Sequence, residues 1–229
     1  MLHQIISGNF SIQTILAELL AVLVIIFLIL PFHEWAHAFT ASCLGDKSIK
    51  NSGRLSFNPL NHIDPAGAIM MFLVGFGWAR PVPIDTRYFK RPKIDMAITA
   101  IMGPVANLVA ALVGRLLYNI LLFFFPEFIY YSFFGGMIET FFLFYISVNI
   151  SLAVFNLIPI PPLDGSKVLF LFLPDSAVNF CYKYQQASFI ILFVLIWTGV
   201  LNGVLGWATN GLYYGISWLA SLPFVPFIN

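Results

Sequence analysis

Long apolar segments separated by short polar stretches constrain the fold of this chain more than any other feature. Two of them, residues 15–44 and 94–125, exceed the roughly 20 residues that a helix needs to cross the hydrocarbon core of a bilayer. Only 9% of the residues are charged, whereas a soluble domain carries about 25%. A water-soluble core cannot hold so much apolar surface. The sequence therefore predicts an all-α polytopic membrane protein surrounded by the lipid bilayer.

Further apolar segments complete a predicted bundle of about five to six transmembrane helices. They are residues 136–157, 187–205 and 207–228. A shorter apolar run at 66–78 is too short to span a bilayer core as a helix. Gly75, Gly77 and Pro81 favour a bent or extended backbone there. We therefore expect a re-entrant, β-hairpin-like segment that enters and leaves the membrane on the same side.

The chain shows no internal repeat and no polar linker that would separate a second domain. We expect one membrane-embedded domain over residues 1–229, with its core at about 15–170 and the C-terminal helices at about 187–228. The net charge of +1, with no basic face in the apolar segments, excludes nucleic acid as a partner.

Lysines and arginines gather in two polar stretches, residues 45–64 and 80–95. Loops that are rich in Lys and Arg favour the cytoplasmic side of a membrane, so both stretches are predicted to be cytoplasmic. Two further crossings then place the proline-rich loop after Leu157 on the same side. The C-terminal end of the first apolar segment and this loop are thus predicted to face each other.

The HEWAH sequence at residues 33–37 has the H-E-x-x-H spacing of a metal site. On a helix, His33 and His37 lie on one face, so both imidazoles can bind one ion. The Glu34 carboxylate is close enough to accept a proton from an activated water. The alternatives are a structural pair of buried histidines or a pair of haem ligands, although axial haem histidines come from widely spaced positions.

A catalytic zinc ion takes three protein ligands and keeps one open position. Asp164 is the best candidate for the third ligand, because it follows a proline-rich stretch that is stiff and extended. Gly165 beside it permits a tight turn and a close approach. The predicted topology places this loop on the same side as the end of the helix that carries the two histidines.

Together, HEWAH and the NLIPIPPLDG sequence at residues 156–165 resemble the paired signature of the site-2 proteases, which are intramembrane zinc metalloproteases. The resemblance implies one Zn²⁺ per chain, bound by His33, His37 and Asp164, with Glu34 as the catalytic base. It implies that Asn156 contacts the substrate or the oxyanion, and that the substrates are transmembrane proteins. Three further stretches resemble the same family, at residues 58–67, 77–83 and 103–107.

The resemblance covers residues 20–170 and includes no inserted PDZ domain and no CBS domain, so we expect a minimal member. Its compact layout favours a prokaryotic plasma membrane, with the active site toward the cytoplasm. The segment at 75–84 is expected to offer an edge with which an extended substrate pairs, or else to seal the cavity that holds the active site.

Two other polar residues have candidate roles. Asn107 is a candidate for contact with the substrate or the oxyanion, but it lies among small residues and can equally bond a neighbouring helix. His62 is a candidate for supporting the metal ligands from outside, against the alternative of a solvated histidine at the interface.

Three other functions fit parts of the pattern. One is a zinc-binding membrane protein without peptidase activity, such as a sensor or a chaperone. Another is a transporter whose charged residues form an ion path. The third is a metalloprotease that cuts at the membrane surface, with Glu127 or Glu139 as its third ligand, but both are predicted to lie on the opposite side.

Overall fold

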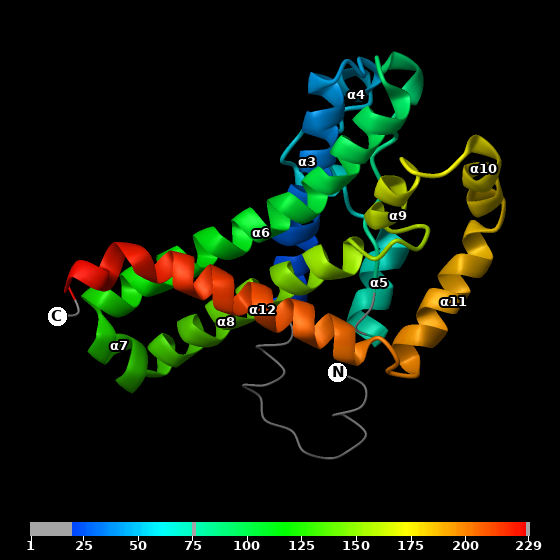
Figure 1. Ribbon diagram of the computed structural model, residues 1–229. Helices are drawn as coiled ribbons and strands as arrows, with labels where there is room; N and C mark the ends of the chain where they lie inside the picture. Colours follow the sequence, from blue (N-terminus) through cyan, green and yellow to red (C-terminus); the bar gives the residue numbers. More distant parts are fainter. Residues whose placement is uncertain (1–19, 75–76, 228–229) are drawn as a thin grey trace.

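The computed structural model describes residues 20–74 and 77–227, and this part of the chain is helical apart from loops and one isolated β-bridge (Figure 1). Residues 15–19 of the first apolar segment and Gly75 lie outside the described ranges. The elements are η1 (Ile25–Ile29, a π-helix), α3 (Leu30–Cys43), α4 (Ser48–Asn51), η2 (Pro59–Asn61), α5 (Pro65–Val74), η3 (Thr86–Tyr88), α6 (Pro92–Phe124), α7 (Pro126–Tyr131), α8 (Phe133–Asn156), α9 (Asp164–Leu169), α10 (Asp175–Lys183), α11 (Gln185–Trp197), α12 (Asn202–Ser221) and η4 (Leu222–Phe227).

Three of the described helices are long and apolar enough to cross a membrane. They are Leu20–Cys43, Pro92–Phe124 and Phe133–Asn156. The pair α10 and α11 makes a fourth if it forms one span, although it is bent by 70°. The helix α12 was expected as a span, but its asparagines, glycines and tyrosines lower its hydropathy. The count of five to six transmembrane helices stays a prediction.

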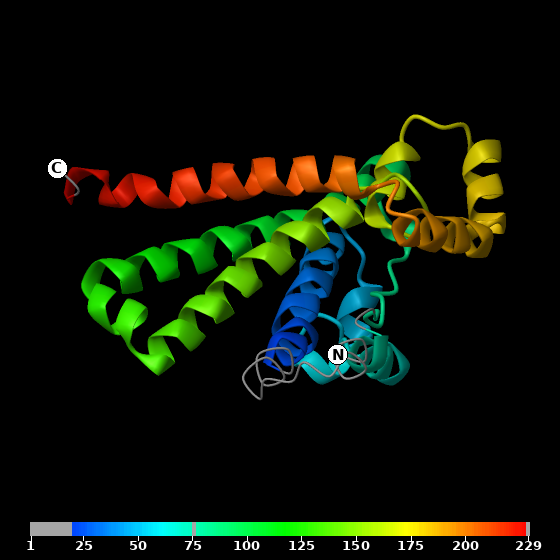
Figure 2. The same cartoon turned by 90° about the horizontal axis from the view of Figure 1, so that it is seen from below.

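The helix α6 lies at the centre of the molecule and packs against α3, α8, α9 and α12. Figures 1 and 2 show α6, α8 and α12 extending together to one end, while α10 and α11 form a separate arm. Small residues such as Ala106, Ala110 and Gly114 are buried along α6 and let its neighbours approach closely. Ala111, Ile146, Ile150 and Ile216 are buried together and join α6, α8 and α12.

The segment predicted to resemble a β-hairpin has one helical limb and one extended limb. Its first limb is the helix α5, because Pro65 suits the first position of a helix and Asp64 caps it. The Asp64 carboxylate accepts a hydrogen bond from the backbone N–H of Gly67 at 3.0 Å. The second limb, residues 77–85, is extended, and a bridge between Ile63 and Ala79 brings the two ends together. Its re-entry into a membrane remains a prediction.

The corner between α7 and α8 depends on one glycine of an adjacent pair. A Cβ atom on Gly135 would lie 2.0 Å from the carbonyl oxygen of Phe128, whereas a Cβ on Gly136 would meet nothing within 4 Å. Gly135→Ala is therefore expected to destabilise the protein by about 1–3 kcal/mol through overpacking. Gly136→Ala is the matched control and should be neutral or stabilising by up to about 1 kcal/mol, since alanine favours helices. Thermal unfolding in detergent measures both, and equal midpoints would contradict this packing.

Candidate metal centre

Two buried imidazoles lie side by side on α3. The Nε2 atoms of His33 and His37 are 3.1 Å apart, and each residue is only 5% exposed. Both belong to the apolar helix Leu20–Cys43, which contains the π-helical turn η1 one turn before His33. Such turns are rare and often occur at functional sites. The spacing in the sequence therefore produces the convergence that it predicts.

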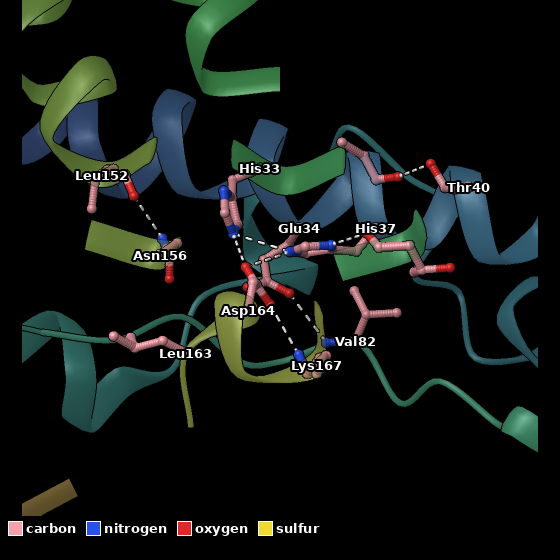
Figure 3. A network of polar contacts seen from close by, with 12 residues as sticks. His33, Glu34, His37, Thr40, Val82, Leu152, Asn156, Leu163, Asp164 and Lys167 are labelled. Atoms are coloured by element: carbon pink, nitrogen blue, oxygen red, sulfur yellow. Dashed lines mark hydrogen bonds and ion pairs between the residues drawn. The ribbon is translucent and has the colours of Figure 1, made fainter. Parts of the chain in front are cut away.

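A carboxylate from a distant part of the chain completes the group. The Oδ2 atom of Asp164 lies 3.2 Å from His33 Nε2 and 3.1 Å from His37 Nε2 (Figure 3). Asp164 is the first residue of α9. Gly165 follows it and, because it has no side chain, lets this helix lie against the end of α8. A Cβ atom on Gly165 would lie 2.2 Å from the carbonyl oxygen of Leu157, so only glycine allows this approach. The loop and the glycine together fix the position of the carboxylate.

The three atoms have the chemistry and the spacing of a metal site. Among the described residues, His33, His37 and Asp164 form a buried group whose possible ligand atoms all lie within 4.8 Å of one another. Ligand atoms at 2.0–2.1 Å from a tetrahedral zinc ion are about 3.3 Å apart, close to the separations found here.

The outer hydrogen bond of His37 fits the same conclusion. Its Nδ1 lies 2.8 Å from the backbone carbonyl oxygen of Thr99, which can only accept, so Nδ1 donates. In a neutral imidazole Nε2 then presents a lone pair to the carboxylate of Asp164. Two such acceptors repel each other unless a metal ion or a proton lies between them. The outer hydrogen bond also holds the ring in the orientation that a metal ligand needs.

A glycine on α6 makes room for the two imidazoles. A Cβ atom on Gly103 would lie 2.3 Å from His37 Nε2 and 2.6 Å from His33 Cε1. Any larger residue would push the rings away from Asp164. Asn107 lies one turn further along α6 and is fully buried, and in the described part of the chain neither atom of its amide has a hydrogen-bond partner.

The carboxylate of Glu34 reaches the extended limb at residues 77–85. It accepts a hydrogen bond of 3.2 Å from the backbone N–H of Val82. Val82 stands between Pro81 and Pro83, which have no N–H, so it supplies the only backbone donor of this triplet. This contact fixes the orientation of Glu34 beside the three possible ligands (Figure 3).

In the described part of the chain, the hydrogen bonds of Asn156 and His62 go to partners outside this group. Asn156 donates from Nδ2 to the carbonyl oxygen of Leu152 at 3.0 Å, within α8. His62 is 1% exposed, and its Nε2 donates to the carbonyl oxygen of Ser56 at 2.8 Å. It is therefore a buried loop residue and not a solvated one. The roles proposed for Asn156, Asn107 and His62 remain predictions.

Sequence reasoning missed Lys167, whose ammonium donates to the Oδ1 atom of Asp164 at 2.9 Å. The signal was present, because a lysine three residues after an aspartate on a helix lies beside it. The resemblance had included the stretches 77–83 and 103–107, but the contacts of Thr99, Gly103 and Val82 were not predicted, because they arise only when distant segments pack together.

Comparisons with known proteins agree with this geometry. Residues 132–199 match Peptidase family M50. The "Putative zinc metalloprotease YwhC" of Bacillus subtilis (strain 168) is 37% identical over 183 residues, which are 79% of this chain and 83% of that protein. The "Putative zinc metalloprotease Rip2" of Mycolicibacterium smegmatis is 31% identical over 76% of this chain and 65% of its own length. No solved structure matches.

The geometry predicts one zinc ion per chain that depends on Asp164. Asp164→Ala should lose most of the bound zinc, because two ligands hold a catalytic zinc far less tightly than three. Asp175→Ala is a matched control, since Asp175 pairs with Lys93 at 2.7 Å and is exposed. Elemental analysis of the purified proteins after dialysis against metal-free buffer measures the zinc content. Full zinc occupancy in Asp164→Ala would contradict the assignment of this ligand.

Proposed function

The chain belongs to peptidase family M50, the site-2 proteases, and we propose that it is a zinc-dependent intramembrane endopeptidase acting on transmembrane proteins. The peptide bonds that it hydrolyses would lie within or near the membrane-spanning segments of those substrates. The observation that supports this proposal best is that Asp164 meets His33 and His37 of an apolar helix in one buried group of possible metal ligands.

The depth of the site supports cleavage inside the bilayer. At ~1.5 Å per residue, His33 and His37 lie about 20 Å and 26 Å along the helix from Leu20. Both positions fall within a hydrocarbon core of about 30 Å, toward the end predicted to be cytoplasmic. Ionisable groups at such depth are costly and usually functional.

Each residue of the site has its own task in the proposed hydrolysis of a peptide bond. Bound zinc supplies Lewis acidity, which polarises the scissile carbonyl and makes water a nucleophile near neutral pH. Glu34 accepts the proton of the attacking water and passes it to the leaving amine. The N–H of Val82 holds the Glu34 carboxylate in place for both transfers. Asn156 keeps a second amide hydrogen beyond its bond to Leu152, and it can donate this hydrogen to the developing oxyanion.

The extended limb at residues 77–85 is the proposed place for the substrate backbone. A helical transmembrane segment hides its peptide bonds, so it must unwind before it can be cut. Pro81 and Pro83 offer no N–H and the N–H of Val82 is already bonded, so residues 81–83 can only accept hydrogen bonds. An unwound substrate would therefore donate to these carbonyls. Sealing of the cavity is the alternative role of this limb.

The competing functions make different demands on the site. A surface metalloprotease would use a downstream glutamate, yet Glu139 accepts a hydrogen bond from Tyr118 at 2.8 Å and is not part of the His–Asp group. A transporter would keep its flux after removal of zinc. A sensor or chaperone would need zinc but no catalytic base, and substitution of Glu34 separates it from a protease.

Glu34→Gln is expected to bind zinc like the wild type and to lose at least ~100-fold in cleavage rate, because glutamine cannot take up the proton. The assay uses purified protein in liposomes with a single-span test substrate, and mass spectrometry locates the cut. Asp64→Asn is a control, since the Asp64 carboxylate caps α5 and has no other hydrogen bond among the described residues. Wild-type cleavage by Glu34→Gln would remove the base from the mechanism, and a cut outside the membrane segment would remove the intramembrane proposal.

The proposed setting is a prokaryotic plasma membrane with the site toward the cytoplasm, and the two native cysteines test the orientation. Cys43 ends α3 and is exposed, and Cys181 lies in α10. Both should react with a membrane-impermeant maleimide only when the cytoplasmic face is open to the reagent. Ser132→Cys in a background without Cys43 and Cys181 should react from the opposite face. Labelling of Cys43 and Ser132→Cys from one side would contradict the proposed topology.

A further inference from the structure

The carboxylate of Asp164 divides its two oxygens between two kinds of partner. Its Oδ2 atom faces the imidazoles of His33 and His37, whereas its Oδ1 atom accepts a hydrogen bond of 2.9 Å from Lys167 Nζ (Figure 3). Lys167 lies three residues after Asp164 on α9, so the helix itself places the ammonium beside the carboxylate.

This ion pair is the most shielded of those between a lysine or arginine and an aspartate in the described part of the chain. The side chains of Lys167 and Asp164 are 25% and 9% exposed, and in every other such pair one partner is at least 45% exposed. Exposed ion pairs contribute little, because water and salt screen them. A shielded pair holds its geometry, and removal of one partner leaves the other without compensation.

We propose that Lys167 is a positioning residue that keeps Asp164 a monodentate zinc ligand. This inference rests on the proposed assignment of His33, His37 and Asp164 as the ligands. A carboxylate with a free second oxygen can turn and bind through both atoms, which occupies the position that a reacting water needs. Lys167 holds Oδ1 away from the ion, so that only Oδ2 points to it. Lys167 itself does not touch the reacting atoms.

The test compares zinc affinity in three variants of the full-length protein in detergent, by competition with a chelator. Lys167→Met should bind zinc about 10–100-fold more weakly, which is the usual effect of losing an outer partner of a ligand. Lys167→Arg keeps a cationic donor and should restore most of the affinity. Lys93→Met is the matched control, because Lys93 also pairs with an aspartate but far along the chain from the ligands, and it should bind zinc like the wild type.

Cobalt substitution gives a second readout that a merely structural lysine would not change. The visible absorption of cobalt is strong in four-coordinate sites and weaker in five-coordinate ones. Lys167→Met should show the weaker spectrum, and Lys167→Arg should show the wild-type spectrum. If the methionine variant does not fold, Lys167→Gln, which retains a neutral donor, is measured in its place with the same expectations at smaller amplitude.

Two results separate the failure of this inference from that of the proposed function. Wild-type zinc affinity and cobalt spectrum in Lys167→Met would overturn the positioning role and leave the metal site intact. A wild-type protein that binds no zinc would instead overturn the ligand assignment on which both proposals rest.

Discussion

The meeting of two imidazoles and one carboxylate in an apolar environment is the constraint on which the rest of the structure depends. Groups of this kind are costly to bury unless each polar atom has a partner. The chain meets part of this cost with contacts from three separate segments, which are α6, α9 and the extended limb. Thr99 orients His37, Lys167 holds the second oxygen of Asp164, Val82 holds Glu34, and the glycine at 103 supplies the space.

The central helix α6 shows how packing serves this site. Its small residues bring α3 and α8 close to its backbone, and Gly103 and Thr99 lie on the part that faces the histidines. Bulky side chains there would increase local burial but would separate the ligands. The helix α6 therefore has little apolar packing near the possible ligands. Its apolar packing lies further along, where Ala111, Ile146 and Ile150 are buried together.

The sequence predicted the parts of the site that depend on local geometry. Helical periodicity was enough to pair His33 with His37, and the stiff loop together with the family resemblance was enough to find Asp164. The partners of these residues come from tertiary approach, which a pattern in one segment does not reveal. The helical first limb at 65–74 was missed although Asp64 and Pro65 form an ordinary helix start, because the glycines and prolines that follow were given more weight. The burial of His62 likewise depends on a loop fold that its neighbours do not specify.

The separation of the ligands along the chain affects how the protein is made. His37 and Asp164 are 127 residues apart, so at 5–20 residues per second the ribosome needs about 6–25 s to add the third ligand after the first two. During that interval the nascent protein holds two histidines that bind metal only weakly. The complete group of three possible ligands can therefore form only after most of the polypeptide has been synthesised.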